Sequence, residues 1–153
     1  MNDPQIELAC REALEWIRTP FADQQQLKGV AADCSSFPMA CYRAAGFLPA
    51  DYRIPKHAVN WHMNKGTPEL YLDGLVAAGM REIDSSEVQR GDFVVYRYGH
   101  AYAHGAIVLA WPHDLIHCSR AARCVARFDA TNEGELLRQW RRQEFRIFTF
   151  RSA

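Results

Sequence analysis

The chain has 153 residues, of which 48% are hydrophobic and 24% charged, and this composition is typical of a folded globular protein rather than a disordered one. Eighteen basic and eighteen acidic residues cancel, which excludes a strong overall field that would attract nucleic acid or an anionic membrane. The apolar runs are too short to span a bilayer. We therefore expect one domain over residues 1–153, with no nucleic-acid partner and no membrane span.

The first residues lack the basic start and the apolar stretch of a secretory signal, which predicts synthesis in the cytoplasm without a signal peptide. The five cysteines are an odd number and include no CxxC pair. This pattern favours reduced thiols over a disulfide framework.

Helical signals dominate the first part of the chain. Asp3-Pro4 is typical of a helix start, and apolar residues at helical spacing then predict a helix over residues 4–18. The polar stretch 21–32 predicts a loop. A second helix is expected over residues 34–45, ended by Gly46.

Residues 49–66 contain two prolines and no clear periodicity, which predicts a long surface loop. A third helix is expected to begin at Thr67-Pro68-Glu69 and to be capped by Gly79. The pattern then changes to short β-rich runs. The later predicted elements are strands over 93–96, 103–110, 115–119 and 145–150, and a helix over 135–142. Helices followed by strands predict an α+β fold with an antiparallel sheet against the helical half.

Cys34 is the candidate nucleophile. It follows Asp33, a good N-cap residue, and a helix N-terminus lowers a thiol pKa and offers free N–H groups to an oxyanion. The alternative is that Cys34 is a small buried hydrophobic residue. Pro38 cannot donate to the carbonyl of Cys34, so the first turn is distorted or the cap moves to Ser35 or Ser36.

His104 is the candidate base, because it opens the apolar run 105–109 and a strand would fix its ring. The alternative is a structural histidine. The pairs His100/His104 and His113/His117 have the spacing of a helical zinc site. Four residues of strand span roughly 13 Å, which is too far for one ion. We expect no metal and no organic cofactor.

In chain order, four segments resemble the motifs of the NlpC-type papain-like cysteine peptidases. The segment Lys28-Gly-Val-Ala-Ala-Asp-Cys-Ser-Ser-Phe37 resembles the D-C-S-G-hydrophobic nucleophile motif. Gly91-Asp-Phe-Val-Val-Tyr96 resembles the entry to the sheet, and His104-Gly-Ala-Ile-Val108 resembles the H-V-G-I base strand. Ile116-His117 resembles the dipeptide that carries a third, ring-orienting polar residue. The resemblance covers roughly residues 12 to 150.

This resemblance implies a papain-like fold in which N-terminal helices pack on a small antiparallel sheet. It also implies hydrolysis of an amide bond in peptidoglycan stem peptides, between D-γ-glutamyl and a diamino acid. Cys34 would attack the carbonyl, His104 would take and return the proton, and His117 would orient His104. Asp33 and Ser35 would line the cleft, with Asp33 recognising a free amine of the peptide stem.

Three further residues are assigned to substrate binding. Ser36 stands where the motif usually has Gly, which predicts a narrower approach to the nucleophile. Phe21 stands where many members have a Tyr whose hydroxyl reaches the site. Trp61 lies in the long loop and is the residue we expect to contact substrate.

The position of His117 conflicts with simple strand pairing. A tight hairpin centred on Pro112-His113 would place His117 opposite Val108 rather than His104. A β-bulge or a strong twist is therefore required for His117 to orient the base.

His104-Gly-Ala-Ile-Val108 and Trp111-Pro112 are most similar to the short versions of the family that phages and prophages encode. That subset implies a protein that is either associated with the virion or released to the cell wall, with peptidoglycan as substrate and phage tail proteins as candidate partners. Two alternatives stay open. One is a noncatalytic tail or assembly module that binds through residues 49–66, and the other is a papain-like acyltransferase or thioesterase.

Overall fold

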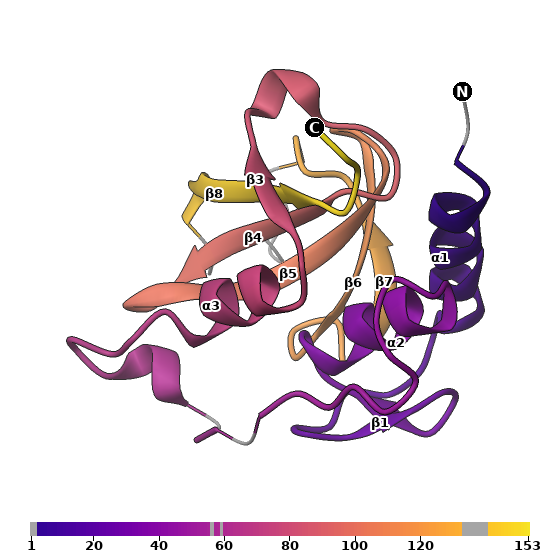
Figure 1. Ribbon diagram of the computed structural model, residues 1–153. Coiled ribbons are helices and arrows are strands. Elements are labelled where there is room, and N and C mark those ends of the chain that lie inside the picture. The colour runs from indigo at the N-terminus through magenta and orange to yellow at the C-terminus, as the bar shows by residue number, and fades with distance from the viewer. Residues whose placement is uncertain (1–2, 56, 59, 133–140) are drawn as a thin grey trace.

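The computed structural model describes residues 3–55, 57–58, 60–132 and 141–153, and in these residues three α-helices precede a six-stranded antiparallel sheet (Figure 1). The helices are α1 (Pro4–Glu15), α2 (Ser36–Ala44) and α3 (Leu70–Ala77). The α+β class expected from the sequence is confirmed. Within the described part of the chain, no helix combines the length and apolar character needed to cross a membrane.

The helix boundaries follow from local chemistry. Asp3 caps α1 by accepting the N–H of Gln5 at 2.9 Å, and the helix ends three residues earlier than predicted, before Arg18 adopts a positive φ of 73°. Helix α2 has Ser35 as its N-cap, which is one of the alternatives that Pro38 left open. Gly46, at φ 86°, follows the end of α2 as predicted.

The sheet has the order β3-β8-β4-β5-β6-β7. Its strands are β3 (Arg81–Ile83), β4 (Phe93–Tyr98), β5 (Ala101–Ala110), β6 (Asp114–Ser119), β7 (Cys124–Phe128) and β8 (Arg141–Thr149). The four predicted strands lie in β4, β5, β6 and β8, whereas β3 and β7 were not predicted.

Two predictions in the connecting segments are wrong. The loop expected over residues 21–32 contains a small hairpin of β1 (Gln26–Leu27) and β2 (Ala31–Ala32). Arg141 and Arg142, the end of the helix expected over 135–142, begin strand β8. The rest of that predicted helix lies outside the described residues. Over residues 49–66 the expected loop contains one short 3-10 turn at Trp61–Met63 among its described residues.

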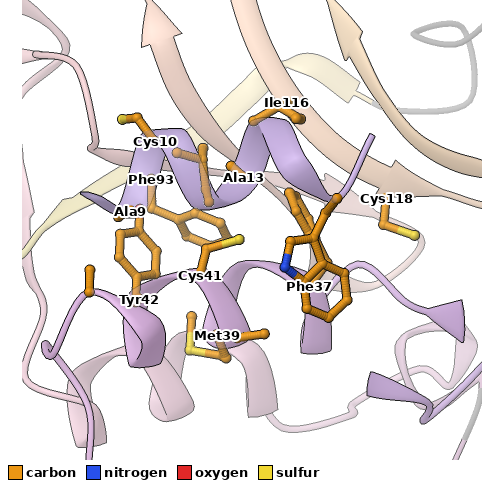
Figure 2. Close-up of a cluster of buried hydrophobic side chains, with 14 of the residues drawn as sticks. Ala9, Cys10, Ala13, Phe37, Met39, Cys41, Tyr42, Phe93, Ile116 and Cys118 are labelled. Atoms are coloured by element: carbon orange, nitrogen blue, oxygen red, sulfur yellow. The ribbon is translucent and has the colours of Figure 1, made fainter. Parts of the chain in front are cut away.

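The core lies between the helices and one face of the sheet, and Figure 2 shows its side chains meeting between α1, α2 and the strands. The labelled members are Ala9, Cys10 and Ala13 of α1, Phe37, Met39, Cys41 and Tyr42 of α2, and Phe93, Ile116 and Cys118 of the sheet. Small residues on α1 let the two helices approach closely. Because strand side chains alternate between faces, Val94 and Tyr96 pack in a second cluster on the opposite face of the sheet.

Candidate active site

Cys34 lies in the tight connection between β2 and α2, and Asp33 organises this connection. The Oδ1 atom of Asp33 accepts the N–H groups of Ser35 at 3.0 Å and Ser36 at 2.8 Å, and its Oδ2 accepts the N–H of Gln24 at 2.7 Å. Asp33 is 6% exposed. It therefore holds the turn that follows the nucleophile, although the N-cap of α2 is Ser35 and not Asp33.

Ser36 faces the interior of this connection. Its Oγ accepts the N–H of Asp33 at 2.9 Å and donates to the carbonyl of Gln25 at 2.5 Å. The residue is buried and is not among the residues that line the cleft described below. The structure therefore does not bring Ser36 to the substrate side, where the sequence places it.

Cys34 itself is half-buried, and its Sγ donates to the carbonyl of Ala103 at 3.4 Å. Burial raises the pKa of the Cys34 thiol, and the negative charge of Asp33 adds to this rise. The lowered pKa expected from the sequence is wrong, because the N–H groups of the turn point at Asp33 instead of at the sulfur. The backbone N–H of Cys34 lowers the thiol pKa and opposes part of this rise.

The base side of the site is built on two strands. His104 lies in β5, opposite Tyr96 of β4, and His117 lies in β6. The Nε2 atom of His104 is 2.9 Å from Nδ1 of His117, and the two rings stand at 85° to each other. The His117 ring also packs on Phe128 of β7, with 4.2 Å between the ring centroids. The structure thus brings together the two histidines that the resemblance pairs.

A register shift between β5 and β6 makes this pairing possible. Ala110 pairs with Asp114, so the hairpin has a three-residue turn, and a bulge before Ala110 pairs Val108 with Leu115. His117 is therefore two residues nearer to His104 than the symmetric hairpin predicts. The bulge that the sequence argument required is present.

Both histidines are neutral at physiological pH. Burial lowers the pKa of His104 to about 3, and burial together with the neighbouring His104 ring lowers the pKa of His117. In the tautomer with a proton on Nε2, His104 donates to His117 and presents Nδ1 as a proton acceptor. Two neutral rings can therefore act as an oriented base.

A cleft of about 820 Å3 runs past the nucleophile and the base. Six of the eight residues assigned to the site from the sequence line it, and these are Phe21, Asp33, Cys34, Ser35, Trp61 and His104. The other two do not line the cleft but hydrogen-bond to residues that do: Ser36 bonds to Asp33, and His117 bonds to His104. The arrangement places a thiol and an oriented imidazole on one cavity, as nucleophilic catalysis requires.

Several other residues of the cleft were not assigned to the site from the sequence. Arg120 Nη2 lies 3.0 Å from both carboxylate oxygens of Asp23, and its guanidinium stands over the Phe21 ring, 5.3 Å from the ring centre. Tyr71 donates its hydroxyl proton to the carbonyl of Cys34 at 2.8 Å. Pro38 was the only signal for this last contact, because it leaves that carbonyl without its helical donor.

Comparisons with known proteins identify the fold. No protein-family model matches the chain, and no curated protein matches it. Among solved structures, it is similar to the P60 domain of an antigen from M. avium subspecies paratuberculosis, with a TM-score of 0.59 and 14% identity over 97% of this chain and 96% of that one. The peptidoglycan hydrolase RipB from Mycobacterium tuberculosis gives a TM-score of 0.60 and 14% identity over 97% of this chain and 66% of RipB.

A third structure, a lipoprotein-like member of the NLP/P60 family from Staphylococcus aureus, gives a TM-score of 0.62 and 18% identity over 95% of this chain. The chain spans 42% of that protein. Identities at this level establish the fold and leave the activity to be argued from the site. The chain has the papain-like α+β fold of the NlpC/P60 peptidoglycan hydrolase domains.

Proposed function

We propose that this protein is a cysteine hydrolase that cleaves an amide bond in peptidoglycan stem peptides, between D-γ-glutamyl and a diamino acid. The observation that carries the proposal is the hydrogen bond between His104 and His117 beside the half-buried thiol of Cys34 on one cleft. The NlpC/P60 fold supports this substrate class, because RipB is a peptidoglycan hydrolase of the same fold.

The proposed reaction begins from a neutral thiol and a neutral imidazole. Nδ1 of His104 takes the thiol proton as Sγ of Cys34 bonds to the substrate carbonyl carbon, and the resulting oxyanion faces the N–H of Cys34. The amide C–N bond then breaks as His104 returns the proton to the leaving amine. Water, activated by His104, hydrolyses the thioester and restores the thiol. His117 holds the ring of His104 throughout.

The cleft also offers charged groups to a peptide stem with free amines and carboxylates. Asp33 is the residue that the resemblance assigns to a free amine, but its oxygens already accept hydrogen bonds from the chain. Asp23 and Arg120 form an ion pair on the same cleft and present one charge of each sign. Asp73 adds another carboxylate to the lining. This set suits a zwitterionic diamino acid.

Acyl transfer or thioester hydrolysis is the second candidate, and the apolar part of the cleft favours it. The apolar and aromatic lining residues include Met39, Tyr52, Ile54, Leu70, Leu75 and Tyr98. Such a wall suits a hydrocarbon chain better than a stem peptide. The same Cys34 and His104 would then form and break a thioester on an acyl group.

The deciding experiment incubates the protein with L-Ala-γ-D-Glu-diaminopimelate-D-Ala and follows the products by mass spectrometry. Release of L-Ala-D-Glu by the wild type, abolished in Cys34→Ala and retained in Cys124→Ser, is the expected result. Cys124 is a matched control because it is also a half-buried free thiol, but lies in β7 away from the cleft lining. Cleavage of an acyl thioester alone would favour the second candidate.

A noncatalytic binding module on the same fold is the outcome if no substrate is cleaved and Cys34→Ala keeps the protein's role. The phage or prophage source, and association with tail proteins, stay predictions from the sequence resemblance. They are tested separately, by asking whether antibodies to the protein label purified virions of a producing strain.

A further inference from the structure

The carbonyl of Cys34 has lost the donor that a helix would give it. On either side of it, the N–H of Phe37 bonds to the carbonyl of Asp33 at 3.2 Å and the N–H of Met39 bonds to that of Ser35 at 3.4 Å. The bond between these two would run from residue 38 to Cys34, and residue 38 is a proline without an N–H. A carbonyl in this position needs another donor.

Tyr71 supplies that donor from a different part of the chain. It lies in α3, and its hydroxyl donates to the carbonyl of Cys34 at 2.8 Å. Burial raises the pKa of the Tyr71 hydroxyl well above its ordinary value, so it keeps the proton that it donates. The nucleophile's peptide is thus held by a side chain that also lines the cleft.

The strand of the base is shaped to admit this hydroxyl. Gly105 follows His104 directly, and a Cβ atom there would lie 2.5 Å from the Tyr71 hydroxyl oxygen and 2.2 Å from the Phe93 ring. The rings of Tyr71 and Phe93 are nearly parallel, at 17°, with 6.0 Å between their centroids. The absence of a side chain at residue 105 therefore lets Tyr71 reach between the base strand and the nucleophile turn.

We infer that Tyr71 is a positioning residue that holds the Cys34 peptide in the orientation needed for attack, in place of the helical hydrogen bond that Pro38 removes. The inference rests on the proposed hydrolase function for its catalytic readout. Its geometric part concerns the thiol alone and can be measured without any substrate.

The experiment compares wild type with Tyr71→Phe, Pro38→Ala and the double variant Tyr71→Phe/Pro38→Ala. The Pro38→Ala substitution restores an N–H that is in position to donate to the carbonyl of Cys34, so it can replace the lost hydroxyl. Two rates are measured: alkylation of Cys34 by iodoacetamide at pH 9, read on its own peptide by mass spectrometry, and turnover of the muropeptide.

In Tyr71→Phe we expect kcat to fall about fivefold to tenfold with KM unchanged, which is the effect of one hydrogen bond that aligns the nucleophile. Alkylation should become about threefold faster, because a loosened turn exposes the thiol. Pro38→Ala alone should behave like wild type, and the double variant should return both rates towards wild type.

Tyr42→Phe is the matched control, because its hydroxyl also donates to a backbone carbonyl, that of Gly91, at 2.8 Å and is buried away from the cleft. It should lower Tm while leaving both Cys34 rates unchanged. Equal rates in Tyr71→Phe and wild type, or a double variant no better than Tyr71→Phe, would overturn the inference. If the wild type cleaves no muropeptide, the proposed function fails while the alkylation series still decides the role of Tyr71.

Discussion

The two halves of the site are held by different means. Cys34 lies in a short connection fixed by side chains that bond to the backbone, chiefly Asp33, Ser36 and Tyr71. His104 and His117 lie on neighbouring strands inside a six-stranded sheet, where ladder hydrogen bonds and packing fix the backbone before any side chain is considered.

This difference has a mechanical consequence. In the strand half of the site (His104 and His117), one substitution changes one side chain and leaves the sheet in place. Its effect should therefore be on kcat rather than on stability. In the turn half of the site (Cys34 with Asp33, Ser36 and Tyr71), each polar side chain supports the backbone that carries the thiol. Its loss should therefore reduce stability and kcat together. Each prediction below tests this division.

The largest effect is expected from His104→Gln, which removes the base. The kcat should fall about 10³-fold, within the range known for a general base, while Tm stays close to that of wild type. His100→Gln is the control, because His100 is an exposed histidine four residues away. Retention of more than a tenth of the activity in His104→Gln would assign the base elsewhere.

His117→Phe should lower kcat by about 10²-fold, because the ring of His104 loses its hydrogen-bonded partner. His117→Asn keeps a polar atom that can accept from His104, and it should recover much of that loss. Turnover rates of the three proteins provide the measurement. Equal activity of the Phe and Asn variants would show that His117 acts only by packing on Phe128.

Asp33→Ala should break the turn half. Its carboxylate accepts three backbone N–H groups and the Ser35 hydroxyl, so the free energy of unfolding should fall by about 2–3 kcal/mol. Urea denaturation measures this fall. Asp23→Ala removes only a largely exposed ion pair with Arg120 and should cost less than about 1 kcal/mol. Equal losses in the two variants would contradict the division.

Acid should weaken the strand half. The pKa of His104 is lowered to about 3 and that of His117 is also lowered, so unfolding binds protons once the pH falls below the ordinary histidine value. Stability should be full above about pH 7 and should fall by about 2 kcal/mol between pH 7 and pH 5 because of His104, with His117 acting in the same direction. Urea unfolding across this range measures it, and His104→Gln should flatten the curve. An equally steep curve in that variant would place the titrating groups elsewhere.

Ser36→Gly should have the smallest effect. It introduces the residue that the resembling motif usually has, but the structure shows the Ser36 hydroxyl bonded to Asp33 and Gln25 behind the cleft. We expect a loss of about 1 kcal/mol in stability and no gain in kcat/KM. A clear rise in kcat/KM would restore the view from the sequence that Ser36 narrows the approach.

The sequence predicted the parts of the molecule that depend on local pattern. The cap at Asp3, the turn glycine Gly46 and the β-rich runs of β4 and β5 are local signals, and the structure confirms them. Strand β3 was missed because three residues are too few for a period to be read, and β7 was missed because only Val125 and Phe128 among its five residues favour a strand. The direction of the pKa shift at Cys34 was also missed, because burial depends on the whole fold.

Candidate catalytic residues could be predicted from the sequence because their residue types carry the chemistry. Hydrogen bonds between distant segments of the chain could not be predicted. Cys34, His104 and His117 were predicted as an ordered set from the motif resemblance, and their catalytic roles stay predictions. The partnership of Tyr71 with Cys34 joins residues 37 positions apart, and only the missing N–H of Pro38 hinted that a donor was needed. Similarly, the β5–β6 register depends on a bulge that no turn residue specifies.

The burial that raises the pKa of the Cys34 thiol also affects how the protein resists oxidation before it meets its substrate. Peroxide oxidises thiolates much faster than thiols, and a raised pKa keeps Cys34 protonated at neutral pH. Sulfenic acid should therefore form slowly, and preparations handled in air should keep their nucleophile without a reductant. The protonated state that keeps the Cys34 thiol unreactive without substrate also protects it from oxidation.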